Sequence, residues 1–339
     1  MPAAKRKQLI RAGLVGYGGA FNMGRHHAEG MQKTGVMKVV AVCDPDPKRR
    51  EAAKQELPGV STFASVGAML RGADFDLAII ITPHNTHARL ALQCLRAGKH
   101  VILEKPMCIT VSEATAMIEA AKRSKVMLSV YHNRRWDGDY LAIRDVIAKG
   151  LIGDVFHLEA FGGGYGHPGH WWRSNKKISG GAFYDWGAHF VDWVLHLVPG
   201  KMTTITGQYQ KRMWHNVTNE DHSEAFVRFD SGAVAHIQLS SLCAAPKSRW
   251  YILGTKGAIV DTGGGQFTVY TRAGDYTASF QVKYYDSVWA SYYEMLADHL
   301  IENKPNPVTP ESARRVIAVI SLAERASKTG KEQKVPYER

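Results

Sequence analysis

One stretch decides the fold of this chain: Val101-Ile102-Leu103-Glu104-Lys105-Pro106. Its first three residues form a continuous apolar run, which is typical of a parallel strand covered on both faces. Pro106 has no N–H to donate and disfavours helix at Lys105, so we expect the strand to end here. Because ligands of open α/β sheets bind beyond the carboxyl ends of strands, Lys105 is a candidate for chemistry. The alternative is a surface ion pair that merely closes a strand.

Strands and helices alternate on both sides of this stretch. Further strands are predicted over 9–15, 39–43, 75–81 and 126–130, and helices over 47–57, 88–97 and 113–124. This alternation predicts an α/β fold with a doubly wound parallel sheet.

A glycine-rich turn, Gly16-Tyr17-Gly18-Gly19-Ala20-Phe21-Asn22-Met23-Gly24, follows the first strand. The backbone N–H groups of such a turn, together with a helix N-terminus, suit a pyrophosphate. Gly16 and Gly18 fit the first two glycines of G-x-G-x-x-G, but position 21 is Phe, so Gly24 fits the third only in a longer loop. A tight turn that binds no nucleotide is the alternative.

The second strand ends in Asp44-Pro45-Asp46. An acidic residue at this place can hydrogen-bond a ribose 2′-hydroxyl, and its charge repels a 2′-phosphate, so we expect NAD as the cofactor. The same residues are also good Asx-turn chemistry. Lys48, Arg49 and Arg50 follow and could tolerate a phosphate.

The residue composition of the chain changes after Trp136. Segment 162–172 is rich in glycine, histidine and aromatic residues. In the segment after it, helical spacing would put Asp185, His189 and Asp192 on one face. Alternating segments further on predict antiparallel strands, and closing helices are expected at about 287–303 and 310–327. These features predict a second domain with an open antiparallel sheet.

The formal net charge is +12, but the basic residues are scattered. No nucleic-acid motif accompanies them, so we expect a partner with phosphates or a solubility effect rather than nucleic acid. No run approaches the ~18 apolar residues of a membrane span. Lys5, Arg6 and Lys7 look like the start of a signal peptide, but the apolar run after them is short. The four cysteines are isolated, which favours a reducing cytoplasm.

Several motifs together resemble the Gfo/Idh/MocA family, the relatives of glucose–fructose oxidoreductase and inositol dehydrogenase. They are Gly24–Ala28, Val42–Asp46, Thr82-Pro83 with His87, Gly98–Pro106, Gly180-Gly181 with Asp185 and His189, and Ser327–Lys331. The chain departs from the family pattern in its enlarged glycine loop and in His84, where the family often has Asn.

The resemblance implies an N-terminal NAD-binding Rossmann domain and a C-terminal α+β domain with an open, largely antiparallel sheet. We place the Rossmann domain at 1–133 and the substrate and oligomerisation domain at 134–308. A C-terminal helix and tail at 309–339 are expected to pack back on the N-terminal domain. The expected assembly is a homodimer or homotetramer through the C-terminal sheet.

The resemblance also implies NAD(P)-dependent alcohol and ketone chemistry. Lys105, held by Glu104, would hydrogen-bond the reacting oxygen, and His189 would act as base or acid. Asp185 would orient His189 or bind a substrate hydroxyl. On the residues alone, a structural histidine within an aromatic helix is the favoured interpretation of His189. Asp185 and His189 could also form half of a metal site that His167 or His170 completes, but no cysteine ligand is nearby and we expect no metal.

The candidate residues form two sets. Expected cofactor contacts are Gly16, Gly18, Gly19, Ala20, Phe21, Asn22, Met23, Asp44, Thr82, Pro83, His84, His87, Glu104 and Lys105. Expected substrate contacts are Lys105, Tyr165, His167, Trp171, Trp172, Arg173, Asp185 and His189. His26 and His27 are expected to pack or cap near the cofactor.

The expected substrate is a small polyhydroxylated ring, namely a sugar, glycoside or cyclitol. Aromatic residues of 162–172, with Tyr184 and Trp186, offer flat faces to sugar C–H groups, and Asn175 and Lys176 add polar partners beside Asp185. Packing of these aromatics at a domain seam or subunit interface is the alternative. Two other functions stay open: a glycoside-cleaving enzyme that uses bound NAD transiently, and a non-catalytic dinucleotide sensor.

Overall fold

The computed structural model describes residues 9–336 and 338, so Lys5, Arg6 and Lys7 lie outside the described residues. The chain forms two compact units. Among the described residues, unit 1 contains 9–108, Ser112–Tyr131 and Ala290–Glu311, and unit 2 contains Ile109–Val111, His132–Trp289 and 312–336 with 338. The functional division expected at positions 133 and 308 stays a prediction.

Unit 1 is built on a six-stranded sheet in which every pair of neighbouring strands is parallel. Its strands are β1 (Ile10–Val15), β2 (Met37–Cys43), β3 (Ser61–Phe63), β4 (Leu77–Ile80), β5 (His100–Leu103) and β6 (Leu128–Val130). Their order, β3-β2-β1-β4-β5-β6, is that of a Rossmann sheet. The predicted fold of this part is therefore confirmed. Val101, Ile102 and Leu103 of β5 are fully buried, as the apolar run predicts.

The helices of unit 1 connect successive strands of its sheet, except for the last one in the chain, which follows the strands of unit 2. They are α1 (Met23–Lys33), α2 (Pro47–Glu56), α3 (Val66–Gly72), α4 (His87–Arg96), α5 (Val111–Ser124) and α9 (Ser291–Glu302), with a short 3-10 helix η1 (His84–Thr86). Local chemistry explains where they start. Asp46 caps α2 by accepting a hydrogen bond from the Lys48 N–H (2.8 Å), and Pro47 occupies the first helical position.

Unit 2 is built on a nine-stranded sheet. Its strands are β7 (Val155–Gly163), β8 (Met202–Gln210), β9 (His222–Phe229), β10 (Val234–Ser240), β11 (Trp250–Gly254), β12 (Gly257–Gly263), β13 (Gln266–Ala273), β14 (Tyr276–Lys283) and β15 (Gln333–Lys334). The order is β14-β13-β12-β11-β7-β10-β9-β8-β15, and only the β7–β10 pair is parallel among these described strands. The prediction of an open, largely antiparallel sheet is confirmed.

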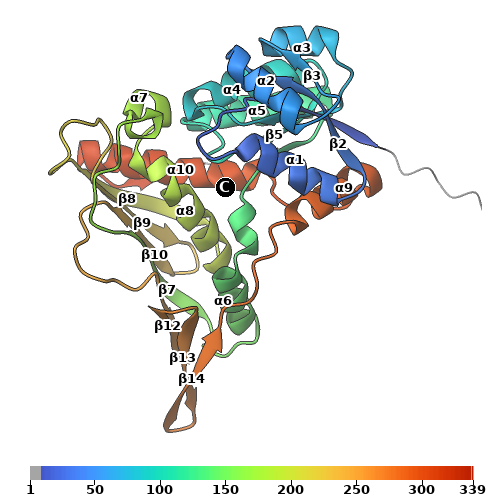
Figure 1. The fold of residues 1–339 in the computed structure, drawn as a ribbon. Coiled ribbons are helices and arrows are strands. Elements are labelled where there is room, and N and C mark those ends of the chain that lie inside the picture. The colour runs from blue at the N-terminus through green and yellow to red at the C-terminus, as the bar shows by residue number, and fades with distance from the viewer. Residues whose placement is uncertain (1–8, 337, 339) are drawn as a thin grey trace, which may run out of the picture. The chain divides into compact units, whose positions relative to one another are not determined.

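Helices cover one face of this sheet. Unit 2 contains α6 (Gly138–Ala148), α7 (Lys176–Ser179), α8 (Trp186–Leu197) and α10 (Pro310–Thr329), with 3-10 helices η2 (Asn133–Trp136), η3 (Trp172–Ser174) and η4 (Ala182–Tyr184). Helix α8 packs on β7 and β10, and the Tyr209 hydroxyl of β8 donates to the Ile320 carbonyl of α10 (2.9 Å). Figure 1 shows α8 and α6 running along the sheet.

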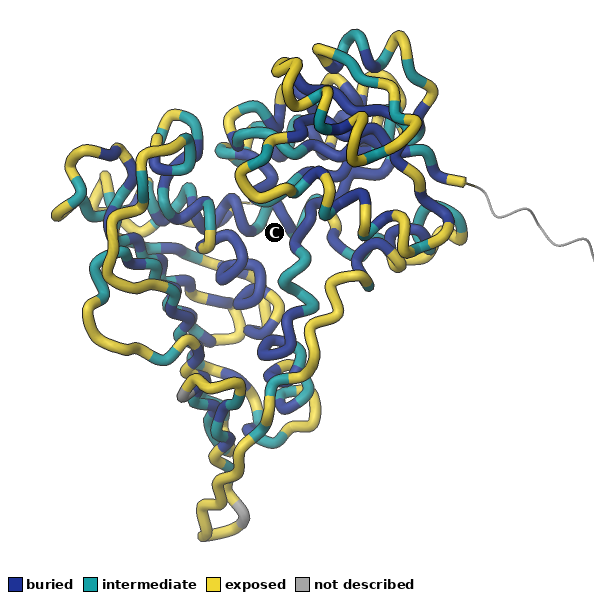
Figure 2. Tube along the Cα trace, in the orientation of Figure 1, coloured by how far each residue is buried: buried dark blue, intermediate teal, exposed yellow. Residues whose placement is uncertain are grey.

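The opposite face of the sheet is not covered by a helix within residues 9–336 and 338. Along β9, buried residues such as Ala225 and Val227 alternate with more exposed ones such as Glu224 and Arg228. Figure 2 shows the same alternation, and β14 at the edge is almost wholly exposed. No helix among the described residues is long and apolar enough to cross a membrane.

Candidate functional site

The glycine turn of unit 1 lies between β1 and α1. Gly16 has a φ of +95°, and a Cβ there would lie 2.3 Å from the Ile81 carbonyl oxygen, so only glycine fits. A Cβ on Gly19 would lie 2.3 Å from Arg49 Nη1, which puts the guanidinium directly on the turn. Asn22, in the left-handed region, ends the turn before α1. The turn therefore brings a helix N-terminus and a cation together, as an anionic pyrophosphate requires.

Asp44 lies at the carboxyl end of β2, beside this turn. The buried carboxylate accepts hydrogen bonds from the Tyr17 N–H (2.8 Å) and from the Asp46 N–H (2.9 Å). Arg50 donates to the carbonyls of Asp44 (2.8 Å) and Pro45 (2.9 Å). These bonds hold the carboxylate at the place where a Rossmann fold presents an acid to ribose.

The segment after β4 is organised by the fully buried side chain of His87. Its ring nitrogens lie 2.8 Å from the Thr82 carbonyl oxygen and 2.9 Å from the Pro106 carbonyl oxygen. His87 thereby joins the ends of β4 and β5, and burial lowers its pKa. Thr82, Pro83 and His84 line this strand end, and the His84 ring lies 5.8 Å from that of His87.

Glu104 and Lys105 follow β5 directly, as predicted. Glu104 Oε2 accepts the Lys105 backbone N–H (3.1 Å), and Oε1 lies 2.8 Å from Nε2 of the buried His27. The other ring nitrogen of His27 bonds to the Tyr293 hydroxyl. Burial would raise the pKa of Glu104, but the His27 hydrogen bond and the Lys105 charge hold it below its usual value. The carboxylate is thus kept ionised beside Lys105.

Helix α8 of unit 2 carries His189 in its first turn. The His189 side chain is nearly buried, and its ring lies 5.6 Å from that of Trp186 and 6.1 Å from that of His132. Asp185 precedes the helix as its N-cap residue, with φ −83° and ψ −93°. The prediction that Asp185 shares a helical face with His189 is therefore wrong, because the helix starts one residue later. Asp185 instead accepts a hydrogen bond from Arg173 Nη1 (2.7 Å).

Asp192, the third member of the predicted face, is not available to a ligand. It is 2% exposed and forms a two-point ion pair with Arg135 (2.6 and 2.8 Å). Burial would raise the pKa of Asp192, but Arg135 and His132 hold it far below its usual value. Asp192 therefore has a structural role: it pairs with His132, whose ring lies next to that of His189.

Aromatic residues of segment 162–173 gather around Arg173. Its guanidinium carbon lies 5.3 Å from the Trp171 ring and 5.2 Å from the Trp172 ring. Trp171 is exposed and Trp172 is half-buried, while Tyr165 and His167 are exposed.

Two residues expected to help bind a sugar are placed differently. Tyr184 is 2% exposed, and its hydroxyl donates to the Ile109 carbonyl (2.6 Å), so its predicted stacking role is wrong. Lys176 forms ion pairs with Glu220 and Glu324. These contacts of both side chains lie within unit 2.

Two further residues near the candidate site, Arg134 and Asn216, belong to no sequence motif that would predict their place. Arg134 lies over Trp186 (4.8 Å from the guanidinium carbon to the ring centre), next to His189, and bonds to Asp137 (3.0 Å). Asn216 reaches His167 across 49 positions of sequence. No group of three or more His, Cys, Asp or Glu side chains that could hold a metal ion occurs among the residues described.

Comparison with known proteins accounts for this arrangement. Residues 10–132 match the model described as oxidoreductase family, NAD-binding Rossmann fold, and residues 140–260 match the GFO/IDH/MocA C-terminal domain. The Escherichia coli protein named uncharacterized oxidoreductase YdgJ is 30% identical over 257 residues, which are 75% of this chain and 71% of YdgJ. The chain belongs to the GFO/IDH/MocA family. The predicted family is thereby confirmed.

Other GFO/IDH/MocA relatives cover nearly the whole chain. The Bacillus subtilis scyllo-inositol 2-dehydrogenase (NADP(+)) IolW is 26% identical, with 96% of this chain and 95% of IolW aligned. The crystal structure of an NAD-binding protein from Listeria innocua superposes with a TM-score of 0.84 at 27% identity and covers 97% of this chain and 100% of that one. The chain is an NAD-binding oxidoreductase with inositol dehydrogenases among its homologues.

Proposed function

We propose that this protein is a dehydrogenase that transfers a hydride between a ring secondary alcohol and a nicotinamide, with a sugar, glycoside or cyclitol as substrate. The observation that carries this proposal is the placement of Lys105 directly after β5 of the NAD-binding sheet, next to an ionised Glu104. A lysine held at this strand end can hydrogen-bond an alcohol oxygen.

NAD supplies the hydride acceptor when it is bound, and the chain supplies position and proton transfer. The glycine turn and Arg49 would hold the pyrophosphate, and Asp44 would hold the adenosine ribose. The Lys105 ammonium stabilises the developing alkoxide while the C–H bond breaks. His189 takes the hydroxyl proton, and Asp185, fixed by Arg173, binds a neighbouring hydroxyl.

The test is a steady-state assay of the full chain with NAD and a panel of hexoses, glycosides, inositols and linear 2-hydroxy acids. Accumulation of NADH with a cyclic polyol supports the proposal, and a clear preference for a linear acid contradicts it. Cleavage of a glycoside without accumulation of NADH would indicate the transient use of bound NAD instead.

Two substitutions test the assigned roles. Lys105→Ala and His189→Ala should each lower kcat by about 10²–10⁴-fold, the usual effect of a positioned proton-transfer group. NAD affinity, measured by fluorescence titration, should stay within a few-fold. Near-normal turnover of His189→Ala would assign the base elsewhere, and lost NAD affinity in Lys105→Ala would make that residue a cofactor anchor.

We propose that NAD(H) is preferred over NADP(H), because the Asp44 carboxylate lies where a 2′-phosphate would approach. In fluorescence titrations NADH should bind at least about tenfold tighter than NADPH, equivalent to about 1.4 kcal/mol. Asp44→Ser should narrow this ratio, and Glu51→Gln, which removes an exposed charge from the neighbouring helix α2, should not. Equal or tighter NADPH binding by the wild-type protein would contradict the proposal. Both cofactors must be titrated because the relative IolW is named for NADP(+).

We also propose that copies of this chain associate through the open face of the large sheet as a homodimer or homotetramer. This face mixes charged residues such as Glu224 with the half-buried ring of Phe226. Light scattering of the purified protein measures the assembly, and a monomer at micromolar concentration would contradict it.

A further inference from the structure

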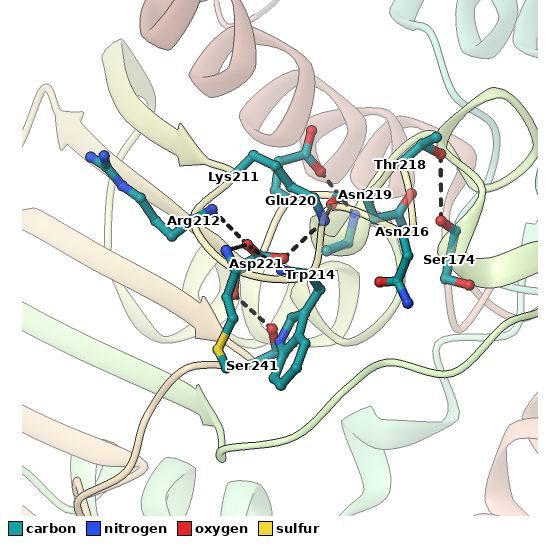
Figure 3. A network of polar contacts seen from close by, with 12 residues as sticks. Ser174, Lys211, Arg212, Trp214, Asn216, Thr218, Asn219, Glu220, Asp221 and Ser241 are labelled. Carbon is teal, nitrogen blue, oxygen red and sulfur yellow. Dashed lines mark hydrogen bonds and ion pairs between the residues drawn. The ribbon is translucent and has the colours of Figure 1, made fainter.

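The connection between β8 and β9, residues 211–221, folds around one buried carboxylate (Figure 3). Asp221 is 2% exposed and accepts hydrogen bonds from the N–H groups of Arg212 (2.6 Å) and Met213 (2.7 Å) and from Lys211 Nζ (2.9 Å). Burial would raise the pKa of Asp221, but these donors hold it below its usual value. A carboxylate satisfied by several donors gives this loop a defined shape.

The same loop is bonded to the segment that carries the candidate substrate residues. The N–H groups of Thr218 and Asn219 donate to the Ser174 carbonyl (3.2 and 3.4 Å). Asn219 Nδ2 donates to the Arg173 carbonyl (2.5 Å). Figure 3 shows Thr218 above Ser174. The two segments thus form one continuous surface that leads to Arg173, whose side chain holds Asp185.

Linked hydrogen bonds on this surface determine which ring nitrogen of His167 and of His170 carries the proton. The Gly169 N–H donates to His167 Nδ1 (3.0 Å), so the single proton of that ring is on Nε2, which donates to Asn216 Oδ1 (3.0 Å). Asn216 Nδ2 then donates to His170 Nε2 (3.4 Å). The proton of His170 is therefore on Nδ1, and this N–H has no hydrogen-bond partner within residues 9–336 and 338.

Aromatic rings frame this chain. The Trp214 ring lies 5.2 Å from that of His167 and 6.1 Å from that of Tyr165, and the Tyr165 side chain is 57% exposed. We call the aromatic–amide cluster the residues Tyr165, His167, His170, Trp214 and Asn216. None of the five is an acid, a lysine or an arginine. Flat apolar faces beside fixed, uncharged donors and acceptors are what a sugar ring requires, since its C–H face stacks and its hydroxyls need directed partners.

We propose, on the basis of the dehydrogenase function above, that the aromatic–amide cluster is a subsite for a second sugar ring, so that the substrate is a disaccharide or similar glycoside. The oxidised ring is the one bound by Asp185 and His189. His170 Nδ1 donates to a hydroxyl of the second ring, which stacks on Tyr165. Asn216 fixes the tautomers of the two histidines.

The test compares kcat/KM for a hexose with kcat/KM for a disaccharide that contains the same hexose, using the full chain with saturating NAD. The unchanged protein should prefer the disaccharide by about tenfold or more. His170→Ala and Asn216→Ala should bring this ratio close to one. His215→Ala is the matched control, since His215 is an exposed histidine of the same loop, and it should keep the ratio. Absence of a preference in the unchanged protein, or equal losses on both substrates, would overturn the proposal.

Direct binding separates failure of the subsite from failure of the proposed function. Saturation-transfer NMR with the disaccharide should show contact with the second ring, and His170→Ala should abolish it. If no sugar is oxidised but this His170-dependent contact persists, the dehydrogenase assignment fails and the subsite stands. A change of oligomeric state in Tyr165→Ser or His170→Ala, measured by light scattering, would show that the cluster is a subunit interface and would overturn the subsite.

Discussion

Single residues at the strand ends of unit 1 hold the backbone that follows the strands in place. Lys105 has no regular strand or helix to hold it, because β5 ends at Leu103. Its place is set by Glu104 on one side and by His87, through the Pro106 carbonyl, on the other. His87 also bonds to Thr82, so the ends of β4 and β5 are joined through one imidazole. We therefore interpret His87 as a positioning residue for Lys105.

Replacement of His87 should separate turnover from cofactor affinity. A neutral His87 ring carries one N–H, so His87→Ala leaves one of the buried carbonyls of Thr82 and Pro106 without this donor, at a cost of about 1–3 kcal/mol. A small displacement of Lys105 should lower kcat by about 10²-fold while NAD affinity falls only a few-fold. His87→Gln, which can still donate to one carbonyl, should recover part of kcat. Thermal melts would establish that both variants are folded at the assay temperature, and unchanged kcat in folded His87→Ala would contradict a positioning role.

At the scale of elements, the β1–α1 turn of unit 1 is constrained by a close approach of backbone. Most glycines with positive φ, such as Gly98 at φ +71°, have open space where a Cβ would lie. Gly16 differs because the backbone carbonyl of Ile81, beyond the end of β4, blocks that position. Backbone cannot be moved aside as cheaply as a flexible side chain. The close approach of β1 and β4 at their carboxyl ends therefore depends on Gly16.

A matched pair of substitutions tests this constraint. Gly98→Ala should cost about 1–2 kcal/mol of unfolding free energy, the usual penalty of a side chain in the left-handed region. Gly16→Ala should cost clearly more and should also weaken NAD binding, because β1 and the turn must shift. Urea denaturation followed by circular dichroism gives both values, and NADH fluorescence gives the affinity. Equal costs for the two substitutions would show that the turn relaxes without difficulty.

The central strands and most helices of unit 1 could be predicted because their local signals are strong, whereas the short elements β3 and α3 were missed. Each central strand is a short apolar run, and turns such as Asp44–Asp46 or Gly98 mark its ends. The hairpin of β9 and β10 was visible in its alternation for the same reason. Strand β8 was missed because Thr203, Thr204, Thr206 and Gln208 dilute its apolar residues. Helix α6 was missed because its apolar residues fall between charged ones.

The candidate site was predicted less completely. Lys105 and His189 were identified through family motifs, and their proposed roles await the substitutions described above. Asn216 and Asp221 could not be identified, because their partners are contributed by the fold rather than by local spacing. Tyr184 was misassigned because an aromatic residue near a glycine pair can either face a ligand or pack in the core. Its side chain is buried and belongs to the core.

At the scale of the whole molecule, the burial of ionisable groups sets the response to acid. Burial lowers the pKa of several histidines, namely His26, His87, His100 and His196. Three buried carboxylates, Glu104, Asp192 and Asp221, behave in the opposite way to simple desolvation, because bonded donors hold their pKa below the usual value, whereas burial raises the pKa of Asp137. In both groups the native state takes up protons at a lower pH than the unfolded chain does.

This common sign predicts that acid destabilises the protein in two stages. As pH falls through about 6.5, the unfolded chain protonates its histidines while the buried ones of the native state resist, so stability decreases. As pH falls below about 4, the unfolded chain protonates carboxylates that are still ionised in the native state, and stability decreases again. Calorimetry at fixed ionic strength should show a midpoint temperature that is nearly constant from pH 8 to 7 and then falls in these two steps. A midpoint that rises between pH 7 and 5 would mean that the native histidines gain protons more readily than those of the unfolded chain, which contradicts the lowered pKa of His26, His87, His100 and His196.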